Sequence, residues 1–206
     1  MKDNHLIEEL GNIRKLMEKS SKFVSISGLS GVLVGIYALL GAAYGYITVY
    51  GFKSQFGYRD FYVTDEAVID KLVIAAIVVL FAALLTGYLM AQRKAKINRQ
   101  SIWNITSKNL LFAVAVPLVT GGIVSIVLIN RGAYSMIASM LLIFYGLALT
   151  SGSVYTFKEV RYLGILEVIL GIFALAIPGY GVWFWAIGFG VLHIIYGLIV
   201  HYKYEK

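Results

Sequence analysis

The chain has 206 residues, of which 59% are hydrophobic and only 14% are charged, and its mean hydropathy is +0.78. A soluble domain carries about 25% charged residues, so this composition excludes a water-exposed globular surface and predicts a surface that faces the lipid bilayer. The net charge of +7 is explained by the Lys and Arg residues of cytoplasmic loops, so no nucleic-acid partner is expected. The chain has no cysteine, which excludes disulfides and thiolate metal sites.

Residues 1–22 precede the first apolar segment and contain an amphipathic pattern of their own. Leu6, Leu10, Ile13 and Met17 share one face of a helix over residues 4–19. This pattern predicts a cytoplasmic amphipathic helix that lies at the membrane interface. The alternative is a short helix that mediates oligomerisation or binds a partner protein. Under this alternative the chain could form a homo-oligomer.

Six apolar segments follow, each close to the roughly 20 residues that a helix needs to cross the hydrocarbon core. They predict the all-α fold class: a polytopic membrane protein with a single-domain bundle of six transmembrane helices and a short cytoplasmic tail at 202–206. The predicted spans are residues 23–49, 71–91, 109–129, 133–151, 161–178 and 181–201.

Positive charges alternate along these segments. Of the 18 Lys and Arg residues, 14 lie before the first span, after the second, after the fourth and after the last. The positive-inside rule therefore places both termini in the cytoplasm. An even number of spans likewise puts the two termini on one side of the membrane, in agreement with this assignment. The four positive charges on the other side are Lys53, Arg59, Lys71 and Arg131.

One glycine spacing occurs in the first, fifth and sixth predicted spans. In each, a central residue has a glycine three positions before it and another four positions after it, which puts all three on one helical face. Small residues on one face allow two helices in lipid to approach closely, so these glycines are predicted packing positions. The triplets are Gly28, Gly31 and Gly35; Gly164, Glu167 and Gly171; and Gly190, His193 and Gly197.

Glu167 and His193 are predicted to lie at similar depths in the bilayer. Glu167 is six residues beyond Arg161, or about 9 Å along a helix, and His193 is eight residues before His201, or about 12 Å. If the fifth and sixth spans pack antiparallel, the two side chains lie at nearly one level. Ionisable residues at such depth are functional hypotheses by default.

Three interpretations of Glu167 and His193 stay open. The pair can lock the bundle as a structural contact, line a polar cavity that binds a small ligand or ion from the cytoplasm, or relay protons. Tyr145, Tyr196 and Pro117 lie at the same predicted level and complete the candidate ligand or proton site. Pro117 either kinks its helix or breaks it to line a cavity.

The sequence lacks the patterns of the common enzyme and metal sites. His193 and His201 are eight residues apart, and the paired histidines of a zinc helix are missing. No phosphate-binding loop, nucleophile elbow or dinucleotide fingerprint occurs in a strand–turn–helix context. We therefore expect a protein that is not an enzyme and that has no cofactor, no catalytic residues and no metal.

Two stretches, SISGLSGVLVGIYAL in the first span and TFKEVRYLGILEVILG leading into the fifth, resemble a group of bacterial six-helix integral membrane proteins with no assigned function. The resemblance extends over the whole chain and implies a location in the bacterial inner membrane.

The expected function is that of a non-enzymatic inner-membrane protein. Its cytoplasm-facing polar site at Glu167 and His193 would bind or move a small solute or a proton. The alternative is a structural or regulatory membrane protein that acts through contacts between helices or with partners. Besides a small solute and another copy of the chain, the expected partner is the lipid bilayer.

Overall fold

The computed structural model describes residues 27–50, 66–97 and 101–206, and these are almost entirely helical, with no strand among them. The predicted amphipathic helix at 4–19 lies outside the described residues and stays a prediction. The elements are α2 (Gly28–Tyr50), α3 (Glu66–Ile97), α4 (Ile105–Asn130), η1 (Tyr134–Met136), α5 (Ile137–Gly152), η2 (Ser153–Tyr155), α6 (Lys158–Ala176), α7 (Gly181–Trp185), η3 (Ala186–Leu192) and α8 (His193–Tyr204).

Five helical segments of the described chain are long and apolar enough to cross a membrane: Gly28–Tyr50, Ala67–Ile97, Ile105–Asn130, Tyr134–Tyr155 and Gly181–Tyr204. The predicted membrane character and helical class are thus confirmed at this level. The remaining helix, α6, has 19 residues and carries four charges, at Lys158, Glu159, Arg161 and Glu167. This helix corresponds to the fifth predicted span, so its crossing of the membrane, and with it the six-span topology, stays a prediction.

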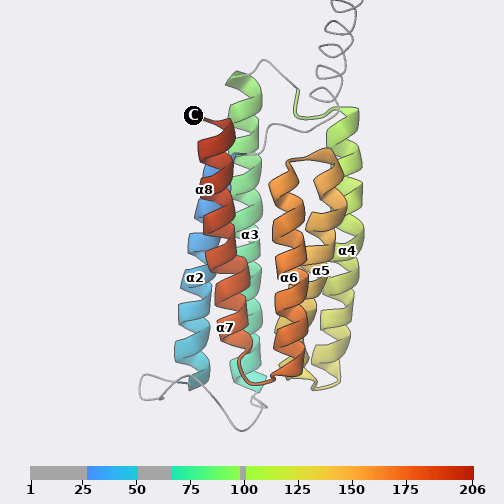
Figure 1. Ribbon diagram of the computed structural model, residues 1–206. Helices are drawn as coiled ribbons and strands as arrows, with labels where there is room; N and C mark the ends of the chain where they lie inside the picture. The colour runs from blue at the N-terminus through green and yellow to red at the C-terminus, as the bar shows by residue number, and fades with distance from the viewer. Residues whose placement is uncertain (1–26, 51–65, 98–100) are drawn as a thin grey trace, which may run out of the picture.

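The long helices run roughly parallel and form two groups of three (Figure 1). In one group, α2 packs against α3 and against the continuous rod of α7, η3 and α8; in the other, α5 packs against α4 and α6. The two groups meet where this rod contacts α5 and α6. The start of α2 and the end of α8 lie at the same end of the bundle (Figure 1).

Glycine makes the close contact between α2 and α8 possible. A Cβ atom added to Gly197 would lie 2.5 Å from the Val32 nitrogen and 2.6 Å from the Gly28 oxygen. A Cβ atom on Gly31 would lie 3.1 Å from the Gly197 Cα, and one on Gly35 would lie 2.6 Å from the oxygen of Gly190, which is in η3 just before α8. Any side chain larger than hydrogen would therefore push these two backbones apart.

A second glycine contact joins α5 and α6. A Cβ atom on Gly164 would lie 2.7 Å from the Gly146 oxygen, and one on Gly171 would lie 2.9 Å from the Ser139 oxygen. The glycines on either side of Glu167 thus make room for α5, whereas those on either side of His193 make room for α2. The same glycine spacing in the sequence thus allows close contact with two different helices.

Glu205 joins three helices at the end of the bundle where the chain finishes. Its carboxylate accepts hydrogen bonds from the Gly28 nitrogen at 3.0 Å, Lys94 Nζ at 2.8 Å and His201 Nδ1 at 2.7 Å. Partial burial raises the pKa of this carboxyl, but the hydrogen bonds outweigh burial and bring the pKa down to about 2. The carboxylate therefore favours the folded state at neutral pH.

This low pKa predicts acid sensitivity. The stabilisation by Glu205 is fully present above the ordinary carboxyl pKa of 4.5 and is lost as the pH falls from there towards about 2. We expect the melting temperature of the wild type in detergent, followed by circular dichroism, to fall over this interval more steeply than that of Glu205→Gln. Parallel acid slopes for the two proteins would contradict this assignment.

Candidate functional site

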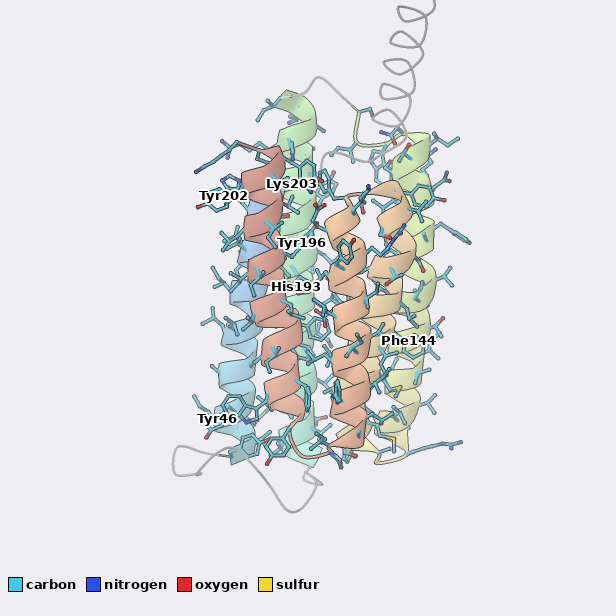
Figure 2. All side chains as sticks on the ribbon, viewed as in Figure 1. Tyr46, Phe144, His193, Tyr196, Tyr202 and Lys203 are labelled. Carbon is cyan, nitrogen blue, oxygen red and sulfur yellow. The ribbon has the colours of Figure 1, made fainter. Side chains whose placement is uncertain are left out.

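Glu167 and His193 face each other across the contact between the two helix groups. Glu167, on α6, has no exposed surface, and His193, at the start of α8, is 4% exposed. Their closest polar atoms, Glu167 Oε1 and His193 Nδ1, are 3.5 Å apart. The structure thus brings the two residues together at one level. Figure 2 shows His193 on the rod of α7, η3 and α8, with Tyr196 nearer its C-terminal end.

The hydrogen bonds of His193 define its proton positions. Nδ1 is 3.0 Å from the Gly188 carbonyl oxygen, which can only accept, so Nδ1 carries a proton and donates it. Nε2 is 2.7 Å from the Tyr145 hydroxyl. In a neutral imidazole Nε2 has no proton, so we assign the Tyr145 hydroxyl as the donor to it.

Helix geometry at η3 provides the carbonyl for His193. Residues Ala186–Leu192 form a π-helix, a wider winding that is rare and that often occurs at functional sites. The absence of a side chain at Gly188 has a second effect, because a Cβ atom there would lie 2.6 Å from Glu167 Oε2 and 2.5 Å from Leu142 Cδ2. Gly188 therefore leaves space for the buried carboxylate while its oxygen orients the imidazole.

The Glu167 carboxylate has no hydrogen-bond partner among the described residues at either oxygen. A buried polar group without a partner costs about 1–3 kcal/mol in mutational data, and more if it is charged. The interaction with His193 does not remove this cost, since the Nδ1 proton is directed to Gly188. Glu167 is thus a destabilising feature of the contact between the two helix groups.

A cavity of about 400 Å³, partly open to the outside of the bundle, lies on the side of His193 that faces away from Glu167. Its wall includes residues of α2, α3, α4, α5, α6 and α8, and most of them are apolar. His193 and Tyr145 are both part of the wall, whereas Glu167 is not. Other polar or aromatic lining residues are Ser30, Tyr88, Trp103, Ser107, Thr156 and Tyr196.

The cavity lies towards the end of the bundle that is predicted to be cytoplasmic. Ser30 is in the first turn of α2, Ser107 is in the first turn of α4, and Thr156 precedes α6. These helix starts share one end of the bundle in Figure 1. The cavity therefore extends from that end inward to His193 and Tyr145.

The other predicted site residues differ in their positions. Tyr196 is one turn beyond His193 on α8 and lines the same cavity. Pro117 lies inside α4, which continues without a break from Ile105 to Asn130, and Pro117 is not part of the cavity wall. The structure thus groups Glu167, His193, Tyr145 and Tyr196 and leaves Pro117 outside.

Sequence reasoning missed Gly188, the π-helix and the α2 and α4 walls of the cavity. Gly188 lies five residues before His193, outside the spacing of three and four that identified the packing glycines. The pair of glycines in AIGFG was a weak signal of irregular winding. The cavity wall combines residues that are far apart in sequence, so no local pattern indicates it.

Comparisons of the chain with protein-family models, with curated proteins and with solved structures found no match.

Proposed function

We propose that this chain is a non-enzymatic, multi-pass protein of the bacterial inner membrane that binds a small, largely apolar molecule. The molecule would occupy the cavity beside His193 and Tyr145 and enter from the cytoplasmic end, where the distribution of Lys and Arg predicts both termini to lie. Binding would be the step by which the protein holds or moves this solute. The location rests on the resemblance to bacterial six-helix proteins and on the distribution of Lys and Arg.

The single observation that carries the proposal is the position of the hydrogen-bonded pair of Tyr145 and His193 in the wall of the 400 Å³ cavity. Sites for small molecules are typically apolar cavities of about 300–1,000 Å³ with a few polar groups that fix orientation. Here the apolar wall would hold the body of the ligand. The Tyr145 hydroxyl oxygen, whose proton is donated to His193 Nε2, would interact with its polar group.

Trp103 provides a test because it lines the cavity. The chain has three tryptophans, so replacing Trp183 and Trp185 by phenylalanine leaves Trp103 as the single indole. Small bromoaromatic compounds of different charge would be added to this protein in lipid nanodiscs. We expect saturable quenching of Trp103 fluorescence by at least one of them.

A cavity-filling substitution separates binding in the cavity from partitioning into lipid. Val34 lines the cavity, whereas its neighbour Leu33 is exposed on α2 and does not. Val34→Phe is expected to weaken the saturable quenching by tenfold or more, and Leu33→Phe is expected to leave it unchanged. Equal quenching in the two variants, or no saturable quenching by any compound, would contradict the proposed function.

A further inference from the structure

We propose that the cavity binds a lipophilic monovalent cation, and that this cation competes with a proton held by Glu167. The inference rests on the proposed function, because it names the ligand class of the same cavity. It also gives a role to the carboxylate, which is buried behind His193 without a hydrogen-bond partner among the described residues.

The cavity wall has the composition that binds organic cations. Tyr88, Trp103, Tyr145 and Tyr196 all line it. The faces of such rings attract a cation within about 6 Å of the ring centre, most strongly where water is excluded. The apolar remainder of the wall suits the hydrocarbon part of the same ligand. An organic cation with an apolar body therefore fits this surface.

Glu167 would supply the negative charge. The 3.5 Å approach of its carboxylate to His193 leaves one imidazole ring between it and the cavity. The titratable side chains that face Glu167 from the neighbouring elements are Tyr145 on α5 and His193 on α8. Two neighbouring helices, α2 and α5, contain no Asp, Glu, Lys, Arg or His at all.

The remaining charged groups lie nearer the helix ends. On α6, Glu159 contacts Lys203 and Tyr204, and Arg161 donates to Ser153. On α4 the charged residue is Lys108, in the first turn, and α3 has no charge between Lys71 and Arg93. Glu167 thus has no permanent cation beside it within these helices.

A buried carboxylate in this position needs one positive charge from outside. An uncompensated ion in a low-dielectric interior costs several kcal/mol, so the carboxylate either binds a proton or is ionised opposite a cation. The exchange balances: one cation enters the cavity, one proton leaves the Glu167 carboxyl, and the net charge of the site does not change.

Competition with one proton determines the pH dependence. Where the free site is protonated, the affinity for the cation is expected to rise about tenfold for each pH unit, since each cation displaces one proton. A neutral ligand of the same shape displaces none and should bind equally at every pH. The charge of the ligand therefore decides whether its affinity depends on pH.

The test compares (4-bromobenzyl)trimethylammonium with its neutral carbon isostere, 1-bromo-4-neopentylbenzene. Quenching of Trp103 would be measured between pH 5.5 and 8.5 in nanodiscs of zwitterionic lipid, in the protein with Trp103 as its single indole. We expect the cation to bind more tightly as the pH rises and the neutral compound to bind independently of pH. Glu167→Gln should weaken cation binding at pH 8.5 by tenfold or more and abolish its pH dependence.

Glu159→Gln is the matched control, because it removes a carboxylate from the same helix outside the cavity wall. It should retain the pH dependence. A second measurement needs no substitution at the site: binding of the cation in weak buffer should release about one proton per cation, detected with an indicator dye. Release of no proton would overturn the proposed competition.

The outcomes distinguish the two proposals. If the neutral compound binds in the cavity and the cation does not, or if both bind without pH dependence, the cation proposal fails and the proposed function stands. If neither these two compounds nor the other bromoaromatics quench Trp103 saturably, both proposals fail.

Discussion

Replacing Gly197 by alanine is expected to lower the free energy of unfolding by about 1–3 kcal/mol, the usual cost of overpacking a dense contact. The added Cβ would lie 2.5 Å from the Val32 nitrogen and 2.6 Å from the Gly28 oxygen. Both are backbone atoms of α2, so no side-chain rotation can relieve the contact and the two helices must separate. Unfolding in mixed micelles of increasing SDS content would measure the loss.

Gly122→Ala is the control for this experiment. Gly122 lies inside α4, and a Cβ atom added there would meet no side chain and no neighbouring helix of the described structure within 4 Å. Alanine is favoured over glycine within a helix by about 0.5–1 kcal/mol, so this variant should be as stable as the wild type or more stable. If Gly197→Ala were as stable as Gly122→Ala, the close contact between α2 and α8 would be wrong.

Glu167→Met is expected to raise the free energy of unfolding, by about 1–3 kcal/mol, while removing the pH dependence of ligand binding. Methionine is unbranched and of similar volume, and it removes a buried polar group that has no hydrogen-bond partner among the described residues. His193 keeps both of its hydrogen bonds, to Gly188 and Tyr145. No group is therefore left newly unpaired by the substitution.

A structural role for Glu167 predicts the opposite result. Removing one partner of a buried ion pair destabilises a protein by about 3–5 kcal/mol, because the other charge is left uncompensated. Leu166→Met is the matched control, since Leu166 is exposed on the same helix and should tolerate the change. A large loss of stability in Glu167→Met alone would favour the interpretation of the pair as a lock of the bundle.

The helical class and the common level of Glu167 and His193 could be predicted from the sequence, whereas the fact that the two side chains face each other could not. Apolar segments of about 20 residues have few structures available in lipid, since the backbone must satisfy its own hydrogen bonds. The common level of the two side chains follows from the helical rise and from the short turn between α6 and α7, where Gly179 has a φ of 101°. Helix formation and residue depth both depend on short stretches of the chain, so they can be derived from one sequence.

The surroundings of the pair could not be predicted. Each triplet of glycines marks a close contact, but its spacing does not say which helix will fill it, and Gly164 and Gly197 contact different partners. The π-helix contains Gly188, which packs closely against Glu167 and Leu142 from other helices, and the cavity is walled by helices of both groups. Such features arise from packing between distant segments.

The central claim is that the cluster of His193 and Tyr145 binds the ligand, and ¹⁵N NMR of the imidazole tests it most directly. The chain has three histidines, so histidine labelling with His193→Gln as reference assigns the signals. Without ligand we expect a protonated Nδ1 and an unprotonated Nε2 in His193. The ligand, (4-bromobenzyl)trimethylammonium or whichever bromoaromatic compound quenches, would then be added until quenching of Trp103 is saturated. Its binding should shift the Nε2 resonance of His193. An unchanged His193 spectrum at saturation would contradict the account.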